Sequence, residues 1–170
     1  MKISFRGPKE SDLKALHKFV NELSRERTFV MRQGEKVSMK EERAWLKGIL
    51  TSIKRGETVF LIVEVDGTLA GSAQITKLKY ANSHVGRFAI SVAKKFRGVG
   101  IGKQLMLEIH ALARKKLRGL KIAELDVFGD NTLARKMYKK FGYVQYGRMP
   151  KGIRHDKKYV DEIFMYKKLK

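Results

Sequence analysis

Three glycines occupy every second position immediately before a helical segment, in FRGVGIGKQLM at residues 96–106. Glycine in a helix costs roughly 1 kcal/mol relative to alanine, so their presence at a helix start needs a compensating reason. Without a Cβ atom, Gly98, Gly100 and Gly102 can adopt positive φ angles or let the backbone approach another molecule closely. The segment therefore predicts a loop whose backbone N–H groups meet a ligand where a helix begins.

Strand-like and helical segments follow one another in a definite order along the chain. Alternating or continuous apolar residues predict strands at 2–6, 58–65, 69–80, 83–93, 121–128, 143–149 and 158–169. Apolar residues at helical spacing predict helices at 8–23, 38–50, 100–118 and 131–142. This order, β-α-α-β-β-β-α-β-α-β-β, predicts an α/β (α+β) fold: a mixed central sheet of about seven strands, helices on both faces, and a single domain over residues 1–170.

Local signals mark several of the boundaries. Ser11 is a plausible N-cap for the first helix, and Ser38 followed by Glu41 has the spacing of a capping box for the second. The Asp-Gly pair at 66–67 predicts a tight hairpin between two strands. Long loops are expected where no periodicity is visible, at 24–37 and 147–159.

The chain carries a formal charge of +21, from 38 lysines and arginines against 17 aspartates and glutamates. Such a surplus favours anionic partners such as nucleic acid or a phosphorylated cofactor, although a solvated lysine-rich surface has the same composition. There are no cysteines and the four histidines lack metal-ligand spacing, so no metal site is expected. No stretch resembles a signal peptide or a bilayer span, which predicts a cytoplasmic monomer or homodimer without a membrane partner.

Two common phosphate-binding motifs do not fit the glycine segment. A Walker A loop needs a Ser or Thr after Gly102-Lys103, where the chain has Gln104. It also needs a glycine five positions before Gly102, where the chain has Arg97. A dinucleotide fingerprint that starts at Gly98 needs its third glycine at position 103, which is the lysine.

A third pattern fits the same segment. A strand, then Arg97-x-x-Gly100-x-Gly102, then a helix resembles the acyl-CoA signature Gln/Arg-x-x-Gly-x-Gly/Ala of the GNAT superfamily of N-acetyltransferases. The physical chemistry agrees, because consecutive N–H groups at a helix N-terminus, supported by the helix dipole, suit a pyrophosphate.

A second motif strengthens the resemblance. In LDVFGDNTLARKMYKKFGY, the spacing of Asn131, Ala134, Tyr138 and the Gly-Tyr pair at 142–143 is similar to the family's next motif. On a helix, Asn131, Ala134 and Tyr138 lie near one face. Both motifs occur in the expected order, and the resemblance covers roughly residues 58–147.

The resemblance implies that acetyl-CoA is the acyl donor and lies where the strands at 83–93 and 121–128 part. The pantetheine arm would run along the first strand, and the pyrophosphate would sit on the glycine loop. The implied cofactor-binding residues are Ile90, Ser91, Val92, Arg97, Gly98, Val99, Gly100, Ile101, Gly102, Lys103, Asn131 and Tyr138.

Catalytic roles follow from the same resemblance. The Val92 N–H would stabilise the thioester oxyanion, and Tyr138 would protonate the departing thiolate, its pKa lowered by the basic surroundings. Asp126 occupies the place of an acidic general base in some family members, with Glu124 and Glu64 as alternatives. The implied reaction is direct attack by an amine, without an acyl-enzyme or a metal.

The expected function is transfer of an acetyl group from acetyl-CoA to a primary amine: a small molecule, an amino-acid-like amine or a protein amine. Residues 24–40 and the loop before the last strand would select the acceptor. Their basic character favours an acceptor with a carboxylate or phosphate over a polycation. The alternative is a basic nucleic-acid- or ribosome-associated protein that uses the fold for binding, or that acetylates nucleic-acid-bound proteins.

Overall fold

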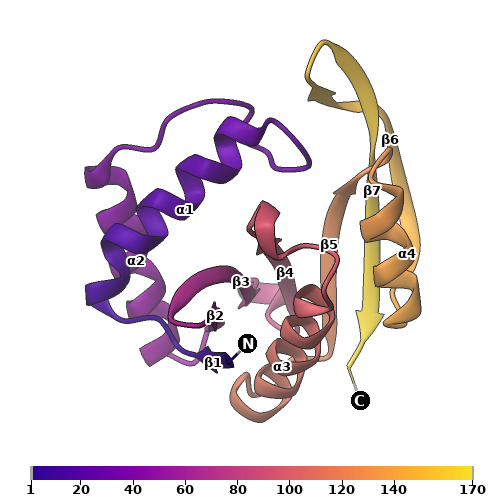
Figure 1. The fold of residues 1–170 in the computed structure, drawn as a ribbon. Coiled ribbons are helices and arrows are strands. Elements are labelled where there is room, and N and C mark those ends of the chain that lie inside the picture. The colour runs from indigo at the N-terminus through magenta and orange to yellow at the C-terminus, as the bar shows by residue number, and fades with distance from the viewer. Residues whose placement is uncertain (1, 170) are drawn as a thin grey trace.

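The computed structural model describes residues 2–169, and its seven strands form one sheet in the order β1-β2-β3-β4-β5-β7-β6 (Figure 1). The strands are β1 (Ile3–Arg6), β2 (Thr58–Val65), β3 (Thr68–Lys77), β4 (Val85–Val92), β5 (Ile122–Phe128), β6 (Val144–His155) and β7 (Lys158–Lys168). The helices are α1 (Leu13–Glu26), α2 (Met39–Lys54), α3 (Ile101–Lys116) and α4 (Thr132–Lys140), and the 3-10 turns are η1 (Glu10–Asp12), η2 (Tyr80–Asn82) and η3 (Lys94–Phe96). The predicted fold class and element order are confirmed.

Helices cover both faces of the sheet, as the strand patterns require. Alternate residues of β2 point to opposite faces, so Phe60 and Ile62 pack with Leu16 of α1 and Leu46 of α2. The intervening β2 residues join the larger core with α3 and α4. Figure 1 shows α1 and α2 together at one side of the sheet, with α3 and α4 toward the other.

The two middle strands separate along their length. Parallel pairing between β4 and β5 is limited to Val85–Arg87 against Ile122–Glu124. Beyond Arg87, β4 continues to Val92 while remaining paired with β3, and β5 continues to Phe128 while paired with β7. The sheet is therefore split at the carboxyl ends of β4 and β5.

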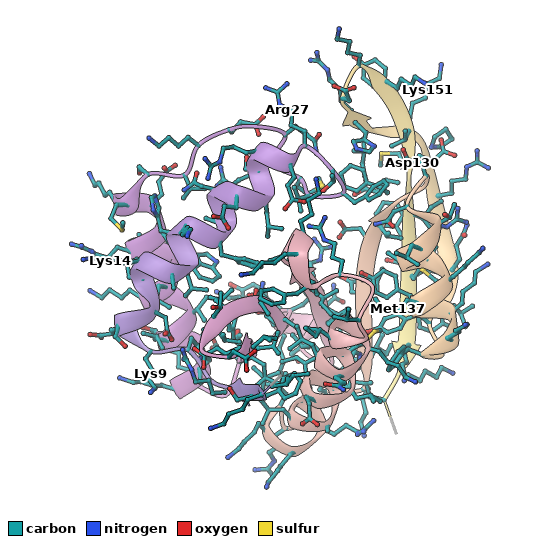
Figure 2. The ribbon with its side chains drawn as sticks, viewed as in Figure 1. Lys9, Lys14, Arg27, Asp130, Met137 and Lys151 are labelled. Carbon is teal, nitrogen blue, oxygen red and sulfur yellow. The ribbon has the colours of Figure 1, made fainter. Side chains whose placement is uncertain are left out.

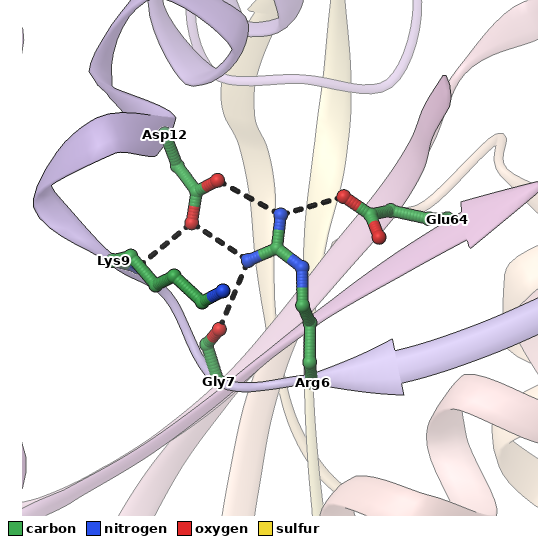
Figure 3. A network of polar contacts seen from close by, with 5 residues as sticks. All are labelled: Arg6, Gly7, Lys9, Asp12 and Glu64. Carbon is green, nitrogen blue, oxygen red and sulfur yellow. Dashed lines mark hydrogen bonds and ion pairs between the residues drawn. The ribbon is translucent and has the colours of Figure 1, made fainter. Parts of the chain in front are cut away.

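One ion-pair network fixes the start of the chain against the sheet (Figure 3). The guanidinium of Arg6 donates to both carboxylate oxygens of Asp12 at 2.8 Å and to Glu64 at 2.5 Å. These hydrogen bonds from Arg6 lower the pKa of Asp12. Glu64, one of the alternative general bases, is therefore paired with Arg6 of the edge strand β1. In the strand order, β2 and β3 separate β1 from β4.

The same network corrects the expected start of the first helix. Ser11 lies inside the turn η1, and the residue before α1 is Asp12. The Asp12 carboxylate accepts the backbone N–H of Lys9 at 2.7 Å as well as the Arg6 pair. The chain therefore enters α1 through a 3-10 turn, and the serine cap is wrong. The capping box at the second helix is confirmed, with Ser38 and Glu41 hydrogen-bonded reciprocally.

The loop expected at 147–159 is instead largely strand. β6 extends to His155 and pairs with β7 through two irregular places, between Gln145 and Gly147 and between Met149 and Ile153. Pro150 lies in the second of these, on the edge strand of the sheet, where a missing N–H is tolerated. Bulges thus let an aperiodic sequence stay in the sheet. No helix among residues 2–169 is long and apolar enough to cross a membrane.

Candidate functional site

The separated part of β4 presents a free strand edge toward β5. Ala93 donates its N–H to the Ala70 carbonyl at 2.8 Å, and antiparallel pairing alternates residue by residue. The backbone of Ser91 therefore faces β3, while the N–H groups of Ile90 and Val92 point the other way. With β5 parted, these groups can pair with an extended ligand.

The glycine loop ends directly at the start of α3. Gly98 and Gly100 adopt φ angles of 79° and 87°, and Gly100 is the N-cap of the helix. A Cβ on either residue would meet no described atom within 4 Å, so the space beside them is open. The first hydrogen bond into the helix runs from the Gln104 N–H to the Gly100 carbonyl. The N–H groups of residues 101–103 are thus available to an anion.

Gly102 differs from its two neighbours in backbone conformation. Its φ is not in the left-handed region that Gly98 and Gly100 adopt. A Cβ there would lie 3.7 Å from Val92 and 4.0 Å from the sulfur of Met137. Figure 2 shows Met137 extending from α4 toward α3. Both distances are ordinary van der Waals contacts, so a Cβ at Gly102 would fit between β4 and α4.

The side chain of Arg97 is exposed and is held by β4 and α1. Its Nε donates to the Val92 carbonyl at 2.8 Å, and its Nη1 lies 2.7 Å from Glu26 at the end of α1. The charge of Arg97 is therefore already balanced, and its side chain fastens the loop to β4 and α1. Lys103, in contrast, is exposed and makes no ion pair with any residue of 2–169.

Asn131 caps α4 with its side chain. Its Oδ1 accepts the backbone N–H of Ala134 at 3.1 Å. The amide NH₂ makes no hydrogen bond with residues 2–169, so this donor remains for another partner.

Tyr138 lies in the core, with only 8% of its surface exposed. Its ring stands edge-on to Phe88 and tilted against Tyr143, with centroids 6.2 Å and 5.9 Å away. Burial, with a smaller contribution from the negative charge of Asp126, raises the pKa of Tyr138 to about 12. The expectation that basic surroundings lower this pKa is wrong, because the lysines and arginines are at the surface while the ring is desolvated.

A polar pair beneath Tyr138 is fully satisfied. The Met106 carbonyl can only accept, so the His110 Nδ1 2.7 Å away carries the proton. Nε2 then accepts the hydroxyl hydrogen of Tyr143 at 2.7 Å. His110 is 4% exposed, and burial lowers its pKa to about 4. The Tyr143 hydroxyl of this neutral pair is hydrogen-bonded, and its ring packs against that of Tyr138. The Tyr138 hydroxyl makes no hydrogen bond with residues 2–169.

Asp126 belongs to an acidic group on the face of the sheet that α1 and α2 cover. Arg87 pairs with Glu124 at 3.3 Å, which places their side chains on one face, and Asp126 follows Glu124 by two residues. Burial raises the pKa values of Tyr138 and Glu162, and the negative charge of Asp126 raises both further. The Asp126 charge thus acts on Tyr138, whereas Glu124 is paired with Arg87.

A pocket of about 290 Å³ adjoins β4 beneath α1 and α2. Its apolar wall includes Trp45 and Phe60, whose ring centroids are 5.6 Å apart. Glu42 and Gln74 also line it. No sequence pattern singles out Glu42 or Gln74, because an acid in the first turn of a helix usually faces solvent and β3 has the pattern of an ordinary strand.

Three aromatic rings join the segments expected to select an acceptor. Phe29, in the segment between α1 and α2, lies 5.9 Å from Phe128 and 5.0 Å from His155. His155, at the end of β6, also contacts Asp130 at 3.0 Å. Figure 2 shows Arg27 and Asp130 at this same end of the molecule. No local pattern signals this contact, since its members are far apart in sequence.

The geometry agrees with a known family. The sequence model of the Acetyltransferase (GNAT) family matches residues 16–143. The chain belongs to this family. The predicted resemblance is therefore confirmed, and the split between β4 and β5 with its glycine loop is the GNAT arrangement in this chain.

Individual proteins are also similar to this chain. It is 34% identical over 106 residues to L-amino acid N-acetyltransferase AaaT of Escherichia coli K12, a match that covers 62% of this chain and 65% of that protein. The fold matches a GNAT acetyltransferase from Streptococcus pneumoniae with a TM-score of 0.88 and 24% identity, over 99% and 100% of the two chains. It also matches yncA, a putative acetyltransferase from Salmonella typhimurium solved with its cofactor acetyl-CoA, with a TM-score of 0.85 and 16% identity over 100% and 95%.

Proposed function

We propose that this protein transfers an acetyl group from acetyl-CoA to a primary amine. The observation that carries the proposal is the open edge of β4 leading directly to the glycine loop at the start of α3. An extended pantetheine arm can pair with such an edge, and its pyrophosphate can bind the N–H groups of a helix N-terminus. The acetyl-CoA found with one GNAT structural relative supports this choice of donor.

Binding would use the backbone more than charged side chains. The N–H and C=O groups of Ile90 would pair with the arm, flanked by Ser91. The loop and first helical turn would hold the pyrophosphate through the backbone of residues 98–103. Lys103 would supply the positive charge, because Arg97 is already paired with Glu26. The Asn131 amide would supply one further donor at the start of α4.

In the reaction, the amine nitrogen attacks the thioester carbonyl carbon and the carbon–sulfur bond then breaks. The Val92 N–H donates to the oxygen on which negative charge develops. Asp126, on the acceptor side of the split, takes a proton from the attacking amine directly or through water. The Tyr138 hydroxyl donates a hydrogen bond to the leaving sulfur, which departs as the CoA thiolate and then takes a proton from water.

The acceptor would approach from the face covered by α1 and α2, where the pocket meets β4. The likeness to an L-amino acid N-acetyltransferase favours a small amine of amino-acid type. Residues 27–38 and the β6–β7 hairpin, joined through Phe29 and His155, would border the entrance.

Incubation with acetyl-CoA and a panel of amino acids, other amines and peptides tests the proposal. Mass spectrometry should find an acetylated amine together with an equal amount of free CoA. Tight, stoichiometric acetyl-CoA binding distinguishes this function from non-specific binding of polyanions by a basic protein. The affinity of such non-specific binding falls steeply as the salt concentration rises. A folded protein that binds no acetyl-CoA and acetylates nothing contradicts it.

A further inference from the structure

The pocket beneath α1 and α2 contains two hydrogen-bond acceptors without donors. The carboxylate of Glu42 makes no hydrogen bond or ion pair with residues 2–169, although the residue is only 5% exposed. The side-chain oxygen of Gln74 is also buried and has no partner among these residues. A fully buried acceptor without a donor is rare, so the Gln74 oxygen, with the unpaired Glu42 carboxylate in the same pocket, points to a donor that arrives with a ligand.

The burial of Glu42 has an electrostatic consequence. Desolvation raises its pKa, and the charges of His17 and Arg32 oppose that rise without forming a contact. Its helix neighbour Glu41 is already engaged in the capping box with Ser38. A buried carboxylate is costly unless a cation pairs with it. Glu42 is therefore poised to receive a positively charged donor.

The acceptor side of the molecule is locally acidic despite the net charge of +21. Arg32 is the single basic residue lining the pocket, against Glu41 and Glu42. On the adjoining strand β5, the Asp126 carboxylate lies on the same sheet face. The field at this side thus favours a cation, opposite to the expectation drawn from the chain's overall composition.

We propose that the acceptor carries a second cationic group beside the amine that is acetylated, and that Glu42 and Gln74 hold this group in the pocket. The inference rests on the proposed function and narrows its substrate class to diamines and amino acids with basic side chains. The reacting amine would lie at the end of β4 near Asp126, and the aliphatic part of the acceptor would pack against Trp45 and Phe60.

Matched amine pairs separate charge from shape. L-arginine and L-citrulline have nearly the same form, but only arginine carries a guanidinium, and L-lysine and L-norleucine differ by one ammonium. In the unaltered protein, kcat/KM for the charged member should exceed that for the neutral one by roughly tenfold or more, as for a charge-assisted hydrogen bond. Equal values for both members of each pair, or a preference for the neutral member, overturn the proposal.

The variant Glu42→Gln keeps the shape of the side chain and removes its charge. The preference for the charged acceptor should fall to within about threefold, while acetyl-CoA affinity stays unchanged because the donor site is on β4 and α3. The control is Glu108→Gln, an equivalent change on the exposed surface of α3, which should keep the full preference. An undiminished preference in Glu42→Gln contradicts the assignment.

A binding measurement keeps the inference separate from the proposed function. L-arginine should raise the melting temperature of the unaltered protein more than L-citrulline does, and Glu42→Gln should abolish that difference. If no amine is acetylated but this difference is found, the proposed function fails and the cation site stands. If amines are acetylated but L-arginine and L-citrulline stabilise equally, the cation site fails and the proposed function stands.

Discussion

Removal of the Tyr138 hydroxyl isolates its chemical role from its packing. The pKa of about 12 exceeds that of an ordinary thiol, about 8.5, by some 3.5 units. At 1.36 kcal/mol per unit, complete proton transfer from Tyr138 to the CoA thiolate is uphill by about 5 kcal/mol. We therefore expect the phenol to remain protonated and to stabilise the leaving sulfur by a hydrogen bond.

The variant Tyr138→Phe should lower kcat by about 10²-fold, the lower end of general acid contributions. Acetyl-CoA affinity should barely change. The Tyr138 hydroxyl makes no hydrogen bond with residues 2–169 and the ring contacts persist, so the free energy of unfolding should change by less than about 1 kcal/mol. Tyr159→Phe removes an exposed hydroxyl on β7 and serves as the control.

The pH profile of the same reaction gives a second readout. Because burial raises the pKa of Tyr138, its donating form persists up to about pH 12. The rate should therefore rise as the acceptor amine loses its proton and show no fall from tyrosine ionisation between about pH 8 and pH 10. Steady-state assays with acetyl-CoA measure both effects. If chemistry limits the rate and kcat in Tyr138→Phe stays within a few fold, the Tyr138 hydroxyl does not stabilise the leaving sulfur and the reasoning is refuted.

Three further predictions concern the loop and the core. Gly100→Val should remain folded, since a Cβ there meets open space and the strain of the positive φ costs about 1–3 kcal/mol. Calorimetry should find acetyl-CoA binding lost, and unchanged affinity contradicts the loop assignment. Lys103→Ala should weaken the salt dependence of CoA and dephospho-CoA binding more than Arg97→Ala does, because Glu26 already neutralises Arg97. The same change of affinity with salt concentration in both variants contradicts this prediction. Between pH 6.5 and pH 4 the unfolded chain protonates His110 while the folded one does not, so the free energy of unfolding should fall by up to about 3 kcal/mol as the pH drops. Denaturant unfolding at several pH values should show a smaller fall in His110→Phe. The same pH dependence in both proteins contradicts the prediction.

Local chemistry made much of the fold predictable from sequence. The capping box of Ser38 and Glu41 marks the start of α2 because both partners lie within one helical turn. The pair at 66–67 adopts positive φ angles in the expected hairpin. Gly98 and Gly100 likewise take the left-handed backbone that their spacing suggested. Each of these features depends on neighbours a few residues away.

The site's electrostatics depend on distant partners, and sequence spacing does not reveal them. Arg97 reads as a free cation until Glu26, at the end of α1, is found 2.7 Å away. Tyr138 lies in a strongly basic chain, yet its desolvation decides its pKa. Glu42 reads as a solvated first-turn acid, and only the packing of α1 over β2–β4 buries it. Burial reverses the expectation for the pKa of Tyr138 and raises the pKa of Glu42.

The amide NMR spectrum during titration with acetyl-CoA tests most directly whether the donor binds where β4 and β5 part. The largest shifts should fall on the N–H groups of Ile90 and Val92 and on the loop residues Gly98 and Gly100, with smaller changes in the first turn of α3. These shifts should reach saturation at one acetyl-CoA per protein chain. Shifts confined to the pocket beneath α1 and α2, or spread over the lysine-rich surface without saturation, contradict the assigned site.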